Sequence, residues 1–177
     1  SGYFLQGNTQ IEAWNTSNNT EIRFIQALAP KAGTIDELAF RTGSVAGDTL
    51  YLAIYACDSN NMPTGDPIFT FNTGTTTANT QYEPTISVTV TEGQPLWLAT
   101  FGQTNRTRIW CTTTGSTSVR AWPAVPRFLS SINYSGDVNQ LRITGQTNGV
   151  WPTLSSSTEF LATDVVYQFK AAIHITE

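Results

Sequence analysis

Residues 50–57 constrain the fold most, because they alternate like a β-strand and are apolar in both sets of alternate positions. One set is Leu50, Leu52, Ile54 and Ala56, and the other is Tyr51, Ala53, Tyr55 and Cys57. Successive side chains of a strand point to opposite faces, so both faces of this strand are expected to be buried. The segment predicts a central strand with protein on each side, or with a neighbouring subunit covering one side.

Other segments also alternate with a period of two, which favours strands throughout the chain. Residues 86–91 alternate between apolar and polar side chains, and residues 165–175 alternate near the end of the sequence. Turn signals separate the strands at Ala32-Gly33, Thr42-Gly43, Ala46-Gly47-Asp48, Met62-Pro63-Thr64-Gly65, Glu92-Gly93 and Ser135-Gly136-Asp137. Helix signals are weak, and residues 72–80 are typical of a surface loop.

The pattern predicts an all-β fold, an antiparallel β-sandwich of jelly-roll type. The 177 residues form one domain in this interpretation, and residues 1–20 could form an N-terminal arm or a connection to a fibre.

The composition excludes several classes of protein. Charged residues make up 12% of the chain and hydrophobic residues 40%, and the formal net charge is −4. The basic residues are scattered, so the sequence lacks the clustered positive charge that nucleic-acid binding requires. It also contains no apolar run of about 20 residues, so no membrane insertion is expected.

Cysteine and histidine are too few to indicate a metal centre. The two cysteines, Cys57 and Cys111, occur in strand-like segments and are interpreted as buried free thiols, with one disulfide as the alternative. The single histidine is His174, and no CxxC spacing is present. A weak Ca²⁺ candidate remains in an acidic turn, where Asp58, Asn60 and Asp66 supply oxygen ligands without the spacing of an EF-hand.

Catalysis finds little support in the sequence, and we expect no enzyme and no cofactor. His174 alternates with Ile173 and Ile175 and is expected to face away from them. Asp36 and Glu37 are adjacent, so strand alternation predicts that they point to opposite faces and cannot form the carboxylate pair of a glycosidase.

The order of elements from residue 24 to residue 101 resembles the C-terminal β-sandwich domains of phage tail fibres and related virion surface proteins. An apolar segment at 24–30 is followed by Gly33-Thr34-Ile35-Asp36-Glu37-Leu38, the strand at 50–55 and the DSNNMPTGDPI turn, and then by Glu92-Gly93-Gln94-Pro95-Leu96-Trp97-Leu98-Ala99. Pro95-Leu96 stands where related sequences commonly have Tyr. The resemblance implies a virion surface location, a homotrimer, contacts with other virion proteins and attachment to the host.

The loop aromatics are the best candidates for a ligand site. An aromatic ring can lie against the apolar face of a sugar, while amide, carboxylate or guanidinium groups bind its hydroxyls. The predicted glycan-binding residues are Trp122, Trp151, Tyr134, Arg127 and Asp137. For each loop tryptophan the alternative is a core plug or a subunit contact. Trp97 lies in an apolar strand and is expected in the core.

Together these patterns favour a non-enzymatic receptor-binding tip of a tail fibre, which recognises a host cell-surface polysaccharide. Two alternatives remain open. The chain could be a capsid decoration protein whose aromatics pack against other subunits, or a secreted bacterial carbohydrate-binding module.

Overall fold

The computed structural model describes residues 3–5, 10–15, 20–104, 108–113, 140–162, 167–169 and 171–176. All of its regular elements are strands, and no helix occurs in these ranges. Accordingly, no helix long and apolar enough to cross a membrane is found in them.

The strands, in chain order, are β1 Tyr3–Leu5, β2 Gln10–Asn15, β3 Ile22–Leu28, β4 Gly33–Arg41, β5 Thr49–Cys57, β6 Pro63–Thr75, β7 Gln81–Tyr82, β8 Thr85–Val90, β9 Pro95–Gly102, β10 Arg108–Thr113, β11 Gln140–Ile143, β12 Leu161–Ala162, β13 Tyr167–Phe169 and β14 Ala171–Thr176.

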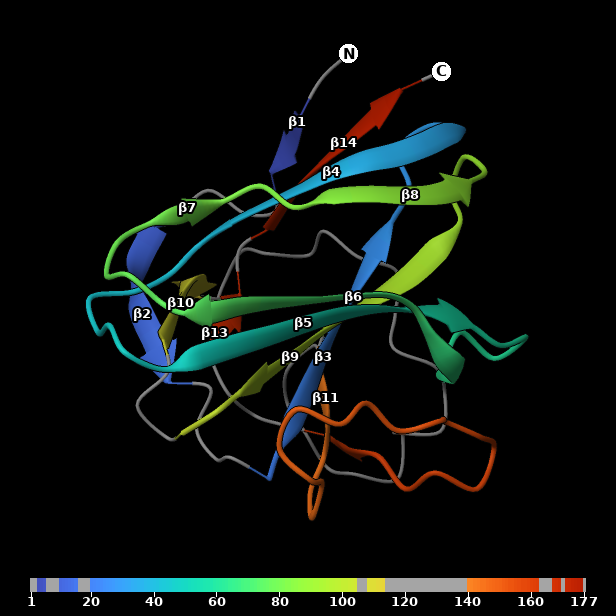
Figure 1. Cartoon of the computed structure of the whole chain (residues 1–177). Helices are drawn as coiled ribbons and strands as arrows, with labels where there is room; N and C mark the ends of the chain where they lie inside the picture. The colour runs from blue at the N-terminus through green and yellow to red at the C-terminus, as the bar shows by residue number, and fades with distance from the viewer. Residues whose placement is uncertain are drawn as a thin grey trace.

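The strands form two antiparallel layers that pack as a sandwich (Figure 1). A six-stranded sheet has the order β12-β11-β3-β9-β5-β6. A five-stranded sheet opposite it has the order β1-β14-β4-β7, with β8 also paired to β4. A three-stranded sheet has the order β13-β10-β2, in which β2 follows β1 along the chain and β13 precedes β14. The predicted all-β antiparallel sandwich is therefore confirmed.

The main core lies between the two large sheets. The six-stranded sheet contributes residues such as Leu52, Ile54 and Leu98, and the five-stranded sheet contributes residues such as Ile35 and Val88. We call this side of the six-stranded sheet its inner face. Burial of these apolar side chains, at roughly 25 cal/mol per Å², is the principal force that holds the two sheets together.

The other side of the six-stranded sheet, its outer face, carries a second core. The buried residues of this core include Tyr55, Trp97 and Phe101, and the segment of residues 144–160 supplies Leu154, Trp151 and Phe160. β5 lies between β9 and β6, and its alternate side chains enter the two cores in turn. The prediction of a central strand buried on both faces is confirmed, and the same chain covers both faces.

Several local predictions are also resolved. β8 has the expected half-exposed pattern, with Ile86, Val88 and Val90 buried and the alternate residues exposed. The Glu92-Gly93 turn is present, closed by a 3.1 Å hydrogen bond from the Gln94 N–H to the Thr91 carbonyl. The predicted loop at 72–80 is partly wrong, because β6 continues to Thr75. The end of β6, residues 72–75, consists of Asn, Thr and Gly, so it lacks the apolar alternation by which a strand is recognised in a sequence.

Candidate functional site

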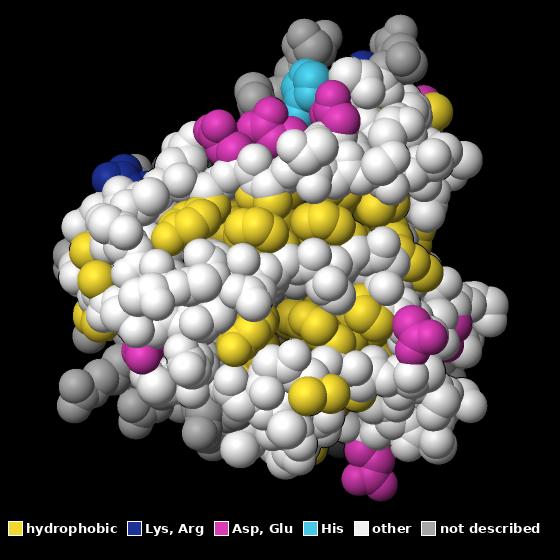
Figure 2. All heavy atoms as spheres, viewed as in Figure 1, with side chains coloured by type: hydrophobic (Ala, Val, Ile, Leu, Met, Phe, Trp, Pro, Cys, Tyr) yellow, Lys and Arg dark blue, Asp and Glu magenta, His cyan; other side chains and the backbone are white. Residues whose placement is uncertain are grey.

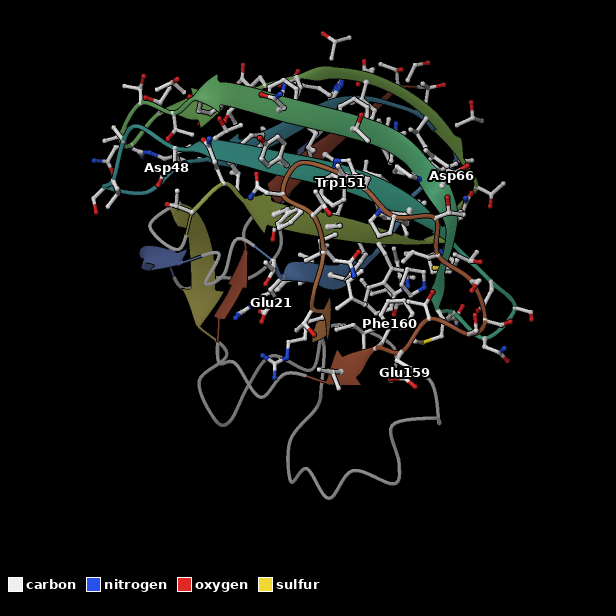
Figure 3. The ribbon with its side chains drawn as sticks, turned by 60° about the horizontal axis from the view of Figure 1, so that its bottom comes forward. Glu21, Asp48, Asp66, Trp151, Glu159 and Phe160 are labelled. Atoms are coloured by element: carbon white, nitrogen blue, oxygen red, sulfur yellow. The ribbon has the colours of Figure 1, made fainter. Side chains whose placement is uncertain are left out.

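The outer face of the six-stranded sheet is crossed by residues 147–154, which we call the strap (Figure 3). At its beginning, the Asn148 side-chain amide donates a 2.8 Å hydrogen bond to the carbonyl of Gly102 at the end of β9. At its end, Leu154 and Gly65 of β6 exchange two backbone hydrogen bonds of 2.8 and 2.9 Å. The strap is thus fixed at both ends to strands that the sheet already orders.

Two further contacts hold the strap between its ends. The hydroxyl of Tyr55, which is buried in β5, donates a 3.0 Å hydrogen bond to the Pro152 carbonyl. The Thr153 hydroxyl donates to the carboxylate of Asp66. Burial raises the pKa of Tyr55 well above its usual range, and the negative charge of Asp66 raises it further. Tyr55 therefore remains a neutral donor at physiological pH.

Trp151 lies at the centre of the strap, over the sheet (Figure 3). Its ring meets Tyr55 with the ring centroids 6.3 Å apart and Phe101 at 6.2 Å, both in edge-to-face arrangements. Such pairs add about 0.5–1.5 kcal/mol to the free energy of burial alone. Trp151 is half-buried, so one part of its ring packs against the second core and another part is accessible to solvent.

Tyr51 of β5 extends this aromatic surface toward the edge of the sheet. It is half-buried, and its ring centroid lies 6.2 Å from that of Phe101. Gly149 of the strap lies against the same ring, because a Cβ added there would stand 3.1 Å from Cζ and 3.2 Å from the hydroxyl of Tyr51. Gly149 also has φ of +73°, a conformation that glycine adopts without cost.

The neighbouring strand, β6, borders the aromatic surface with small side chains. Phe69 and Phe71 face the inner core, so Ile68, Thr70 and Asn72 project on the outer face, and all three are exposed. Asn72 is the direct cross-strand partner of Tyr51. Val150 of the strap is 57% exposed and Ile68 is 45% exposed. The result is a shallow surface with an aromatic floor and neutral polar and apolar margins, part of which is visible below β6 in Figure 2.

Of the five predicted glycan-binding residues, Trp151 alone lies in the described part of the chain. Trp122, Tyr134, Arg127 and Asp137 lie outside the described residues, so their role stays a prediction. Trp97 is 1% exposed, as predicted for a core residue, and its indole N–H donates a 2.8 Å hydrogen bond to the Asn61 carbonyl.

The structure gives the three weak Ca²⁺ candidates separate roles. Oδ1 of Asp58 accepts hydrogen bonds from the backbone N–H groups of Asn60, at 2.8 Å, and Met62, at 2.9 Å, which closes the turn between β5 and β6. Asp66 instead contacts Thr153 of the strap. Within the described residues, no group of three or more His, Cys, Asp or Glu side chains is arranged to hold a metal ion.

Asp36 and Glu37 do not point to opposite faces, and the prediction from simple alternation is wrong. Ile35 and Leu38 are both buried, and the ladders of β4 with β14 and with β8 shift register between residues 35 and 37. This β-bulge inserts Asp36 as an extra residue, which leaves both carboxylates on the face of β4 that points away from the main core. His174 faces away from its buried isoleucine neighbours, as predicted, and its Nδ1 lies 2.6 Å from Oδ1 of Asp36.

A buried charged group lies on the inner face, beyond the apolar core. The side chains of Glu21 and Arg23 are each 6% exposed and form an ion pair, and Glu21 also contacts Arg142 at 3.2 Å. Burial lowers the pKa of Arg23, and the Glu21 carboxylate opposes that effect. Thr100 is the cross-strand partner of Arg23, and its buried hydroxyl has no hydrogen-bond partner among the residues that the structure describes.

Cys57 is a half-buried free thiol, so the disulfide alternative does not apply to it. Burial raises its pKa to about 11. A thiol that remains protonated is a poor nucleophile, so Cys57 is not suited to catalysis at neutral pH.

Sequence reasoning missed Tyr51, which it placed in a central strand without a role at the surface. The available signal was the Asn148-Gly149 pair shortly before Trp151-Pro152, which indicates a tight turn that positions an aromatic residue.

A comparison of the chain with protein-family models finds no match, and a comparison with curated proteins finds none either.

Proposed function

We propose that this chain is a non-enzymatic glycan-binding domain at a virion surface, the receptor-binding tip of a tail fibre, and that the strap surface is its sugar site. The observation that carries the proposal is a half-buried tryptophan and a half-buried tyrosine on one rigid face, Trp151 and Tyr51, beside exposed Thr70 and Asn72. Aromatic rings of this kind offer an apolar surface to the C–H groups of a pyranose, and the polar neighbours bind its hydroxyls.

The strap is held in one position, so its surface is suited to a preformed binding site rather than to a lid that opens and closes. The strap is tied to β5, β6 and β9 by hydrogen bonds along its length, so little conformational entropy is lost when a ligand binds. The tip assignment itself rests on the resemblance in the order of elements, together with the all-β sandwich.

The charges on this face favour a neutral polysaccharide. Residues 147–154 carry no charge, and Asp66 is the one charged residue from Pro63 to Thr75. In Figure 3 the carboxylates Asp48 and Asp66 lie toward the two sides of the view, with Trp151 between them. An acidic sugar would meet like charge at Asp66, whereas the carboxylate can accept hydrogen bonds from the hydroxyls of a neutral sugar.

The test is a microarray of bacterial surface polysaccharides, probed with wild type, Val150→Arg and Leu161→Arg. Both replaced residues are exposed apolar side chains, at 57% and 46%, so neither change should unfold the protein. Val150 lies on the strap, whereas Leu161 belongs to β12 at the opposite edge of the sheet from β6. We expect selective binding that Val150→Arg abolishes and Leu161→Arg preserves.

Absence of binding across the array, with binding of the protein to empty capsids instead, would reject this function in favour of capsid decoration. Equal loss in both variants would place any sugar site away from the strap.

A further inference from the structure

Asn148 and Gly149, at the start of the strap, form the only Asn-Gly pair in the sequence. Every other asparagine is followed by a residue that has a side chain. Asparagine is chemically labile, because the backbone nitrogen of the next residue can attack its side-chain carbonyl carbon. A glycine in the second position leaves that nitrogen unshielded, since glycine has no Cβ. This pair is therefore the position in the chain that is most susceptible to loss of an amide group.

The reacting groups lie in a turn at the surface. Asn148 and Gly149 are its two central residues, and a 3.0 Å hydrogen bond from the Val150 N–H to the Thr147 carbonyl closes it. Thr147 and Val150 are exposed. The Gly149 N–H donates no hydrogen bond to any residue that the structure describes. Local opening of a surface turn costs far less free energy than global unfolding, so the attacking nitrogen is accessible in the folded protein.

The reaction would remove a group that anchors the strap. Nδ2 of Asn148 donates hydrogen bonds to the carbonyls of Gly102, at 2.8 Å, and Gln103, at 3.2 Å. These two bonds join the start of the strap to the end of β9 and the residue that follows it. The same nitrogen is expelled when the amide is lost. The carboxylate that remains has no proton to donate at neutral pH, and it would face two carbonyl oxygens.

We propose that Asn148-Gly149 is a deamidation site and that its modification releases the start of the strap from β9. In the first step the Gly149 nitrogen gives up its proton and bonds to Cγ of Asn148, the Cγ–Nδ2 bond breaks, and ammonia leaves. The product is a five-membered succinimide ring. Water then adds to one of the two ring carbonyl carbons, and the bond from that carbon to the ring nitrogen breaks. The result is an aspartate or an isoaspartate at position 148, and no oxidant or reductant takes part.

The products disturb the strap beyond the two lost hydrogen bonds. Isoaspartate adds one carbon to the backbone, which lengthens the turn and removes the bond between Val150 and Thr147. Gly149 then shifts against the Tyr51 ring, on which it packs in the native strap. The backbone bridge of Leu154 lies further along and remains. We therefore expect a local release of the first strap residues without unfolding of the sandwich, whether or not the strap surface binds sugar.

Mass spectrometry of the aged protein tests the reaction. The folded protein is incubated at mildly alkaline pH and body temperature and then digested with trypsin. Peptide 143–170 contains Asn148 as its only asparagine, and peptide 42–106 contains several asparagines, none of which precedes glycine. We expect a gain of about 1 Da, from replacement of NH₂ by OH, to be at least about tenfold more frequent in the first peptide. No gain at Asn148, or an equal extent in both peptides, overturns the proposal.

Hydrogen exchange of two variants tests the consequence. Asn148→Asp reproduces the aspartate product. Asn79→Asp makes the same change at an exposed turn residue, which accepts a hydrogen bond through its backbone carbonyl. In Asn148→Asp the Val150 N–H should exchange at least about tenfold faster than in wild type or Asn79→Asp, while the Leu154 N–H remains protected. Unchanged protection of Val150 overturns the proposed release, and so does an equal loss at Val150 and Leu154, which would indicate unfolding.

Discussion

Replacement of Gly149 by alanine tests how the strap positions the aromatic surface. Gly149 has φ of +73°, and an added Cβ would lie 3.1 to 3.3 Å from three atoms of the Tyr51 side chain. Gly145 provides a matched control, because its φ is also +73° but an added Cβ would have no atom within 4 Å. The two substitutions therefore share the cost of placing alanine in a left-handed backbone conformation, and only Gly149→Ala adds a contact with Tyr51.

The expected magnitudes follow from these two terms. A left-handed backbone costs an alanine about 1 kcal/mol relative to glycine, so Gly145→Ala should lower the free energy of unfolding by about that amount. Gly149→Ala adds a crowded contact with a ring at the end of a half-buried side chain. Overpacking of this kind costs about 1–3 kcal/mol, and the low end applies because Tyr51 can shift toward solvent. We expect a total of about 2–3 kcal/mol.

Urea denaturation of both variants, in the wild-type and Tyr51→Ala backgrounds, measures the difference. Removal of the Tyr51 ring should reduce the cost of Gly149→Ala to that of Gly145→Ala. Equal costs for both glycines in the wild-type background, with no coupling to Tyr51, would refute the packing of the strap on this ring.

Four other sites in the structure give one prediction each. Trp97→Phe should lower the free energy of unfolding by about 2–4 kcal/mol in urea denaturation, because it creates a cavity and removes the shorter of the two hydrogen bonds to the Asn61 carbonyl, leaving that from the Gln26 amide at 3.4 Å. Asp58→Ala should lower the free energy of unfolding by about 1–2 kcal/mol, and Asp58→Asn by much less, because an amide oxygen can still accept a hydrogen bond from both N–H groups. Because Asp58 acts in this turn through hydrogen bonds, EDTA should leave the Tm unchanged. Glu21→Ala should cost about 3 kcal/mol or more, measured by the same denaturation, because it leaves the buried Arg23 charge poorly compensated. The free energy of unfolding should fall as the pH rises from 9 to about 11, because in this range the unfolded chain loses the Cys57 proton while the folded chain retains it. In melting curves recorded over this pH range, Cys57→Ala should remove part of that decline.

Much of the fold could be predicted because the relevant signals are local. The two-sided apolar pattern of β5 and the one-sided pattern of β8 each follow from strand alternation, and both are confirmed. Alternation failed at Asp36 and Glu37, because a bulge depends on the pairing of β4 with its neighbours and leaves no clear mark in one strand's sequence. The length of β6 was missed for a related reason, since its threonines and asparagine are also typical of loops.

The candidate site was less predictable than the fold. Trp151 was identified as an aromatic residue beside a turn, but its neighbours come from distant parts of the sequence. Tyr51 lies about a hundred positions before Trp151 in the sequence. How much of the Tyr51 ring is exposed depends on where Gly149 of the strap packs against it, which the sequence of β5 does not indicate. Such long-range contacts are set by tertiary packing, which a single sequence does not specify. The predicted partners at 122–137 lie outside the described residues and remain predictions.

The most direct test of the sugar site is isothermal titration calorimetry with a polysaccharide fragment that wild type selects on the array. The account predicts at least about a tenfold increase in Kd for Val150→Arg, and less than about a twofold change for Leu161→Arg. Unchanged affinity in Val150→Arg, with both variants folded, would contradict the assignment of the strap surface as the binding site.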